Sequence, residues 1–292
     1  MSTLQLSMMD DDPWFINQKL FNQLSEFLQP NSSLPAASIV DLLDDLFPSH
    51  RNPQDEPAGE PIEDPCTFFW NIWEPFHVCA RQIPHNHPSQ EKLVACLKLI
   101  RQTTSSKTAV VHLASYHGSP EGCCRLWQDM HCFGGKFWEM ARFMLCESGT
   151  EDQWRNMMAY AARLTRDGIA DLSFFGKQSL AAALGYAVVQ ADRRGRSGHD
   201  VLAMDFSPGS DLDENVAIAA DWIAYAGGEL FEKYNEVDGD AVKHDFGWQF
   251  WEQRFGEIVA DERINEQTRR TAEDAKEKME DLKNGFWVSS GG

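Results

Sequence analysis

The chain has 292 residues and a formal net charge of −19, from 45 acidic and 26 basic side chains. This balance excludes electrostatic binding to nucleic acid or to an anionic membrane, because both need a basic surface. Ten tryptophans and 18 phenylalanines supply enough apolar area for a substantial core, so most of the chain is expected to fold.

Two short helices are predicted at the N-terminal end of the chain. Asp10–Asp12 precede Pro13, a pattern typical of a helix start, and apolar residues then recur at helical spacing (Ile16, Leu20, Leu24 and Phe27). A second helix is predicted over residues 36–47. Residues 48–65 contain five prolines and several acids, so they are expected to form an exposed linker. We therefore expect residues 1–47 to be a two-helix arm with a disordered start.

Residues 68–102 predict two amphipathic helices joined by a turn that is rich in proline and histidine. The apolar face of the first helix carries Phe69, Trp73, Phe76, Ala80 and Ile83. Pro75 either kinks a continuous helix or lies in the first turn of a new helix that begins near Glu74. The prolines of IPHNHP end this helix, and Pro88 suits the first position of the next one.

A second stripe of this helix carries Trp70, Glu74, His77 and Arg81 at spacings of four, three and four. A carboxylate three residues before a histidine suits acid–base catalysis, and an arginine one turn further suits anion binding. Glu74 and His77 are therefore candidate catalytic residues, and Trp70, Arg81 and His87 are candidate binding residues. The alternative is a solvated helix face with weak pairing and, for His87, a helix-capping role.

The segment after residue 102 contains the best strand candidate, the apolar run 109–114. A single isolated strand leaves its backbone unsatisfied, so helix or loop is the preferred interpretation. Residues 118–122 are expected to turn. Residues 123–130 and 136–146 predict two helical pieces on either side of Gly134 and Gly135.

Two helices are predicted between residues 150 and 190. The first opens at a capping box formed by Thr150 and Gln153 and ends before Gly168. The second begins at Ser173 and buries Leu180, Leu184 and Val188. The segment ADRRGRSGHD that follows is expected to be a solvated loop.

Three further helices complete the predicted fold. The first contains Gly227 and Gly228, each of which costs about 1 kcal/mol relative to alanine. A helix crossing too tight for a side chain is the simplest reason for such a pair. Residues 246–259 predict an aromatic helix and residues 268–283 a charged outer helix, followed by a flexible tail at residues 285–292.

Other motifs with known chemistry are not found in the sequence. His85 and His87 lack the helical spacing of a metal site, and the cluster of Cys123, Cys124, His131 and Cys132 contains no CxxC pair. Phosphate-loop, dinucleotide, nucleophile-elbow and kinase motifs are not seen either. We therefore expect neither a metal nor a cofactor.

The cysteines and the chain start indicate where the protein resides. Seven cysteines, an odd number, do not suggest a disulfide framework, so reduced thiols are expected. The first residues lack a basic start and a long apolar run, which argues against a secretory signal and a membrane span. A cytoplasmic location is expected, with the nucleus as the alternative.

Several motifs together resemble an all-helical family of uncharacterised proteins found widely in filamentous fungi. The motifs are the hairpin of residues 68–102 with its QIPxxHP turn, Trp154 and Asn156 with AYAARL, ENVAIAADWI and FGWQFWEQRFGEIV. The likeness covers residues 68–279. It implies a helical fold but no activity, cofactor or catalytic residue. Some members lie beside genes of specialised metabolism, which implies an enzymatic or accessory role.

The sequence therefore predicts an all-α fold, an irregular bundle or array of helical hairpins with roughly nine or ten helices, whose main domain spans residues 66–284 and has no sheet. The expected function is that of an accessory protein that binds an unknown protein partner or small-molecule ligand. The alternative is a cofactor-independent enzyme of fungal specialised metabolism that uses Glu74 and His77 in an aromatic-lined pocket.

Overall fold

The computed structural model describes residues 2–51, 63–103, 108–112, 121–146, 150–184, 186–190, 199–203, 209–235 and 247–290. Helices dominate these residues, so the expected all-α class is confirmed. The chain divides into two compact units, the first formed by Met1–Tyr160 with Asp167–Ala170 and the second by Ala161–Arg166 with Asp171–Gly292. The arm and tail boundaries drawn from the sequence stay predictions, and residues 52–62 of the expected linker lie outside the described residues.

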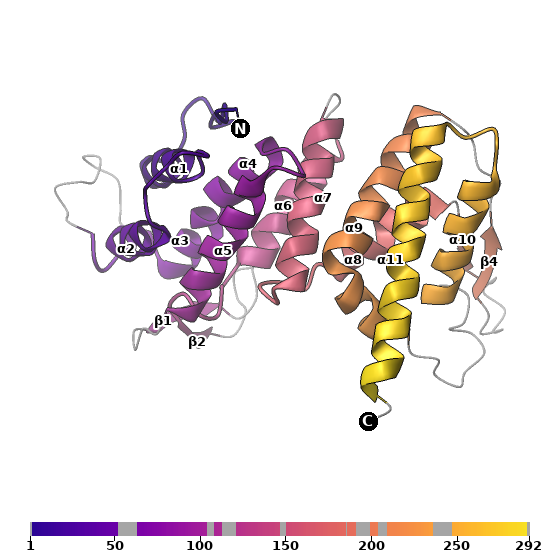
Figure 1. Ribbon diagram of the computed structural model, residues 1–292. Helices are drawn as coiled ribbons and strands as arrows, with labels where there is room; N and C mark the ends of the chain where they lie inside the picture. Colours follow the sequence, from indigo (N-terminus) through magenta and orange to yellow (C-terminus); the bar gives the residue numbers. More distant parts are fainter. Residues whose placement is uncertain are drawn as a thin grey trace. The chain divides into compact units, whose positions relative to one another are not determined.

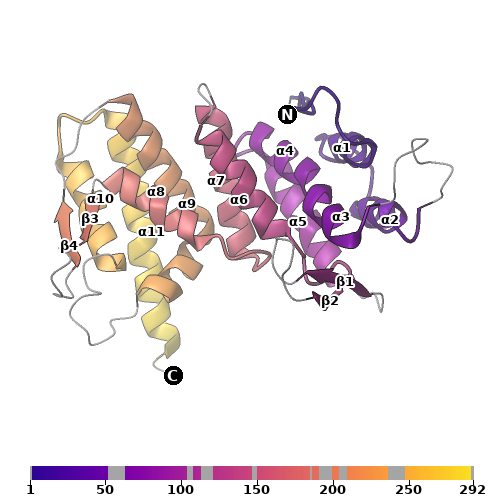
Figure 2. The same ribbon diagram turned by 180° about the vertical axis from the view of Figure 1, so that it is seen from behind.

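The residues described in the first unit form helices and one small hairpin (Figures 1 and 2). Its helices are α1 (Phe15–Phe27), α2 (Ala36–Leu46), α3 (Pro65–Ile72), α4 (Glu74–Gln82), α5 (Pro88–Gln102), α6 (Phe133–Met144) and the part of α7 (Glu151–Arg166) up to Tyr160. Helix α1 packs against α4, and α2 packs against α5. Helix α1 begins later than the acidic run predicted, because Asp10 Oδ1 accepts the N–H of Asp12 in a local turn instead of capping a helix.

The structure resolves the two alternatives for Pro75. Helix α3 ends at Ile72 and α4 begins at Glu74, with Pro75 in the first turn of α4. Proline is tolerated there because the N–H it lacks would have no partner inside the helix. The side chain of Asp64 caps α3 by accepting the N–H groups of Cys66 and Thr67 at 2.8 and 3.2 Å. Glu74 therefore lies at a helix start.

The preference for helix or loop at residues 109–114 was wrong for residues 109–112, and residues 113 and 114 lie outside the described residues. Thr108–His112 form strand β1, which pairs antiparallel with β2 (Glu121–Arg125) and places Val110 opposite Cys123. The hairpin satisfies the backbone that an isolated strand would leave unpaired. The helix expected over residues 123–130 was also wrong, because the first three of these residues belong to β2 and a turn follows. The two glycines before Lys136 lie in the first turn of α6 rather than between helices.

An aromatic cluster centred on Trp127 forms part of the core of the first unit. The Trp127 ring lies 5.8–6.4 Å from the rings of Phe47, Phe68, Phe69 and Trp73, all in edge-to-face geometry. Such contacts stabilise beyond the apolar area they bury. The indole N–H of Trp73 donates to the carbonyl of His131 at 2.7 Å. The cluster thus joins α2, α3 and the segment that leads into α6.

The second unit contains the rest of α7, α8 (Ser173–Leu184), β3 (Tyr186–Gln190), β4 (His199–Ala203), α9 (Ser210–Tyr234), α10 (Trp248–Ala260) and α11 (Glu266–Ser290). Helix α9 packs against both α8 and α11, and α10 packs against α11 (Figure 1). The predicted continuation of α8 to Val188 was wrong, because Val188 lies in β3 opposite Val201 of β4. Of the loop expected over residues 191–200, the last two residues belong to β4, and residues 191–198 lie outside the described residues.

Close helix contacts explain one glycine of the predicted pair. A Cβ on Gly227 would lie 2.7 Å from Leu282 Cδ1 of α11, whereas a Cβ on Gly228 would have no atom within 4 Å. Gly176 of α8 is as tight, because its Cβ would lie 2.8 Å from the buried ring of Trp222. Ala226, just before the glycine pair, has non-helical φ and ψ and kinks α9. The tight crossing predicted from the sequence is confirmed at Gly227 alone.

Candidate functional site

The predicted stripe of α4 faces α6 and α7 of the first unit. His77 is fully buried and Arg81 is 6% exposed, while Glu74 is half-buried at the start of the helix. The stripe is therefore not the solvated face that was the alternative interpretation. Spacings of three and four residues do place these side chains on one side of the helix. Their partners come from other helices rather than from the stripe itself.

His77 lies among aromatic rings. Its ring centroid is 4.8 Å from Phe133, 5.6 Å from Phe137 and 5.9 Å from Tyr160. Neither ring nitrogen has a hydrogen-bond partner of acceptable geometry, and neither does the Tyr160 hydroxyl. Burial lowers the pKa of His77 to about 3. The Phe133 backbone acts in the opposite direction, and the Lys136 charge adds to the lowering. His77 is therefore neutral at physiological pH.

Glu74 is paired with a lysine instead of with His77. The ammonium of Lys136 lies 3.1 Å from Glu74 Oε2 and 2.8 Å from Glu139 Oε2. Lys136 is 8% exposed, and two carboxylates compensate its buried charge. The expected contact between Glu74 and His77 is therefore not formed, because the carboxylate is held by α6.

Arg81 takes part in a hydrogen-bonded connection between α4 and α7. Its Nε donates to Gln153 Oε1 at 2.7 Å, and its carbonyl accepts from Asn156 Nδ2 at 3.0 Å. Asn156 Oδ1 also accepts the N–H of His85 at 2.7 Å. One asparagine thus satisfies a carbonyl in the last turn of α4 and an N–H of the turn that follows. This arrangement fixes the turn and explains why a polar residue is buried in α7.

The other two candidate binding residues have separate surroundings. His87 Nδ1 accepts the N–H of Ser89 at 3.2 Å, so His87 caps α5 as the simpler interpretation had it. Trp70 is half-buried on α3, and the ring partners of His77 come instead from α6 and α7. The five predicted site residues are thus not assembled into one pocket.

Sequence reasoning missed the residues that complete the stripe, namely Lys136, Gln153 and Tyr160. Lys136 follows the glycine pair of α6, and Tyr160 belongs to the AYAARL run, whose spacing indicates only a packing face. Lys136 lies 62 positions from Glu74 in the chain, Gln153 lies 72 positions from Arg81, and Tyr160 lies 83 positions from His77. No local spacing joins residues so far apart, so the sequence offers no signal for these contacts.

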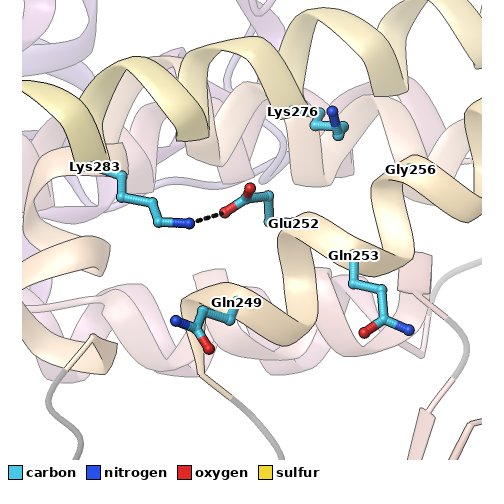
Figure 3. A pocket seen from close by; sticks show the side chains of 6 residues that line it. All are labelled: Gln249, Glu252, Gln253, Gly256, Lys276 and Lys283. Atoms are coloured by element: carbon cyan, nitrogen blue, oxygen red, sulfur yellow. Dashed lines mark hydrogen bonds and ion pairs between the residues drawn. The ribbon is translucent and has the colours of Figure 1, made fainter.

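A groove lies between α10 and α11 in the second unit (Figure 3). It has a volume of about 390 Å³ and is open to solvent. Five polar or charged residues and one glycine line it: Gln249, Glu252, Gln253, Gly256, Lys276 and Lys283. The Lys283 ammonium lies 3.2 Å from Glu252 Oε2 and so connects the two helices across the groove. Lys276 pairs with Glu280 of its own helix at 2.7 Å.

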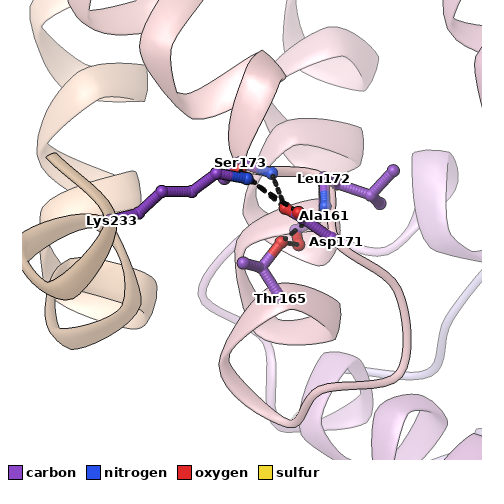
Figure 4. A network of polar contacts seen from close by, with 6 residues as sticks. All are labelled: Ala161, Thr165, Asp171, Leu172, Ser173 and Lys233. Carbon is purple, nitrogen blue, oxygen red and sulfur yellow. Dashed lines mark hydrogen bonds and ion pairs between the residues drawn. The ribbon is translucent and has the colours of Figure 1, made fainter.

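A second polar cluster joins α8 to α9 in the same unit (Figure 4). Lys233 Nζ donates to Asp171 Oδ2 and to Ser173 Oγ, both at 2.7 Å, and the Ser173 hydroxyl donates to Asp171 Oδ1 at 2.6 Å. Hydrogen bonds from Lys233 and Ser173 lower the pKa of Asp171. A serine activated by lysine needs a desolvated, neutral amine. Here the lysine contacts a carboxylate and is nearly half exposed, so the cluster is a structural link.

Two kinds of feature are not found among the residues that the structure describes. These residues contain no group of three or more His, Cys, Asp and Glu side chains placed to hold a metal ion. In the same part of the chain, every helix is too short or too polar to cross a membrane.

Comparison with known proteins places the chain in a family. No curated protein and no solved structure matches it. Residues 73–255 match a family described as protein of unknown function (DUF3632). The match begins at Trp73, includes the stripe of α4 and ends at Phe255 of α10. Because it covers more than half of the 292 residues, the chain belongs to the DUF3632 family of proteins of unknown function.

Proposed function

We propose that the protein is a non-catalytic accessory protein of the cytoplasm that binds a small polar ligand or a polar segment of a partner in the groove between α10 and α11. The groove volume of about 390 Å³ lies in the range of small-molecule sites. Gln249 and Gln253 are exposed one turn apart. Gln253 Nε2 donates to Glu257 Oε1 at 2.8 Å, so the groups offered to a ligand are the amide oxygen of Gln253 and the amide of Gln249.

The composition of the groove supports binding rather than chemistry. Its six lining residues supply amides, one carboxylate and two ammonium groups, but no imidazole, thiol or hydroxyl. Nucleophilic and acid–base catalysis most often use those missing groups. The ion pairs of Lys283 and Lys276 leave the lining close to charge balance, which favours a ligand with hydrogen-bonding groups over a strong anion.

An enzyme centred on Glu74 and His77 is supported less well. A general base works best with a pKa near the working pH, and burial lowers the pKa of His77 to about 3. Glu74 is held by Lys136 and does not contact the imidazole. The acid–base role of these two residues stays a prediction, and so does a role in specialised metabolism.

A thermal-shift screen tests the binding proposal. The full-length protein would be heated with a panel of amides, carboxylates, sugars and phosphates, each tested singly. A ligand present at 100 times its Kd adds about 2.7 kcal/mol to the free energy of unfolding, a shift of several degrees in Tm. Lys283→Met and Gln253→Ala are expected to remove the shift. Lys278→Met, an exposed lysine of α11 outside the groove, is the matched control.

A ligand that stabilises the wild type and the groove variants equally would bind elsewhere, and the proposal would then be wrong. The same holds if every class of compound leaves Tm unchanged.

A further inference from the structure

The first residues of the chain form an extended segment that lies along the first unit. Burial alternates along it: Leu4, Leu6 and Met8 are half-buried, whereas Gln5 and Ser7 are exposed. This period of two is that of an extended backbone with one face against the protein. The N-terminus lies beside α1 and α4 (Figure 1). The segment therefore contacts the unit through alternate apolar side chains.

One glutamine binds the backbone of Leu4 through two hydrogen bonds. Gln29, two residues beyond the end of α1, accepts the Leu4 N–H at 3.0 Å and donates its Nε2 to the Leu4 carbonyl at 3.2 Å. The same Nε2 also donates to the carbonyl of Ser25, four residues earlier, at 3.0 Å. The amide is thus oriented by its own helix before it binds the segment.

A second glutamine repeats this geometry three residues further along the segment. Gln82, the last residue of α4, accepts the Ser7 N–H at 2.9 Å and donates its Nε2 to the Ser7 carbonyl at 2.8 Å. Its Nε2 also donates to the carbonyl of Val78, again four residues earlier, at 2.8 Å. The Ser7 hydroxyl adds a longer bond to Gln82 Oε1 at 3.3 Å. Gln29 and Gln82, the glutamine pair, therefore hold the segment in the same way.

Four of the five hydrogen bonds between the glutamine pair and the segment go to its backbone, and one goes to the Ser7 hydroxyl. Backbone hydrogen bonds supply affinity for an extended peptide whatever its sequence, and contacts with alternate side chains supply selectivity. Both amides are fixed by their helices, which reduces the entropy lost on binding. Helices α1 and α4 pack against each other, so the spacing between the two glutamines is fixed as well.

We propose that the glutamine pair is a binding site for extended peptides with apolar residues at alternate positions, and that the chain's own residues 4–8 occupy it as an internal competitor. A tethered segment has an effective concentration in the millimolar range, so it outcompetes a weakly binding partner. A partner segment with the same pattern binds when it displaces residues 4–8. A partner peptide therefore binds only if its affinity and concentration together outweigh the binding of residues 4–8.

Fluorescence anisotropy of a labelled peptide tests this proposal. The probe is STLQLSMMDDD, the sequence of residues 2–12. The full-length double variant Leu4→Pro/Ser7→Pro lacks both N–H donors that the glutamine pair accepts, so its own segment is released. We expect the peptide to bind this variant at least tenfold more tightly than it binds the wild type. Adding Gln29→Ala and Gln82→Ala to the Leu4→Pro/Ser7→Pro variant is expected to weaken its peptide binding at least tenfold. Adding Gln18→Ala on α1 to the same variant is expected to leave its affinity unchanged.

Two controls keep the test decisive. A peptide with aspartate in place of Leu4, Leu6 and Met8 is expected not to bind, whereas alanine in place of Gln5 and Ser7 is expected to be tolerated. If the released variant does not fold, hydrogen exchange in otherwise wild-type protein replaces it. Gln82→Ala removes the acceptor of the Ser7 N–H, so exchange of the Ser7 amide is expected to speed up by tenfold or more.

Equal peptide binding by the wild type and the released variant would overturn the proposal. So would the absence of peptide binding, or an affinity that the glutamine substitutions leave unchanged.

Discussion

At the scale of single residues, burial decides the chemistry of His77. Its ring is enclosed by Phe133, Phe137 and Tyr160, and burial lowers its pKa to about 3 from an unfolded value near 6.5. The unfolded chain therefore binds a proton between these two pH values that the folded chain does not. Protonation of His77 in the unfolded chain therefore lowers the free energy of unfolding. This loss is absent above pH 6.5 and grows as the pH falls toward 3.

We expect the free energy of unfolding of the wild type to fall by up to about 1.4 kcal/mol per pH unit below pH 6.5 because of His77. His77→Phe removes the titrating group, so its stability is expected to fall less steeply over the same range. Urea unfolding at pH 7.5, 6.5, 5.5 and 4.5 measures both slopes. His131, whose pKa is also lowered by burial, leaves a residual slope in the variant.

Parallel curves for the wild type and His77→Phe would contradict the assignment.

The same residue shows how far sequence could predict the candidate site. Spacing correctly placed Glu74, His77 and Arg81 on one side of a helix, because the helical period fixes that geometry. Spacing could not predict that Lys136 would hold Glu74 or that Gln153 would hold Arg81. Those partners are set by the packing of α6 and α7, which long-range contacts determine.

At the scale of elements, three glycines should respond differently to one added methyl group. Gly176→Ala places a Cβ 2.8 Å from the Trp222 ring, which is fully buried, so we expect a loss of about 1–3 kcal/mol. Gly227→Ala meets the end of the Leu282 side chain, which can rotate away, so the loss should be smaller. Gly228→Ala meets nothing and is expected to stabilise α9 by up to about 1 kcal/mol.

Urea unfolding of the three variants gives the order directly. Gly228→Ala is the internal control, because it lies one residue from Gly227 in the same helix. Equal losses at all three positions would mean that backbone freedom, rather than side-chain contact, requires these glycines.

The elements that the sequence predicted well are those with a local signal. Helices α2, α5 and α11 each carry a repeated apolar stripe, and their predicted positions agree with the structure to within a few residues, apart from the longer C-terminal end of α11. The two hairpins were missed because a strand of five residues carries little periodicity. β2, with the sequence EGCCR, has no apolar alternation at all, so only its pairing with β1 identifies it as a strand.

At the scale of the whole molecule, the net charge of −19 opposes the compact state. The exposed ion pairs, such as Arg125 with Asp129 and Lys276 with Glu280, stabilise by less than about 1 kcal/mol each. Repulsion among unpaired acids acts over the Debye length, which is about 30 Å at 10 mM salt and about 10 Å at 100 mM. Salt therefore weakens the repulsion over longer distances than it weakens the short-range pairs.

We accordingly expect the urea midpoint to rise when NaCl is increased from 10 to 300 mM, and KCl at the same concentration should give the same rise.

A variant with Glu262→Lys, Glu277→Lys and Asp281→Lys, all exposed positions, changes the charge by +6, from −19 to −13. Its midpoint should depend less on salt than that of the wild type, because fewer like charges remain to be screened. A midpoint that falls with salt in the wild type would mean that attraction within ion pairs outweighs the repulsion, and the acidic surface would then not limit the stability of this fold.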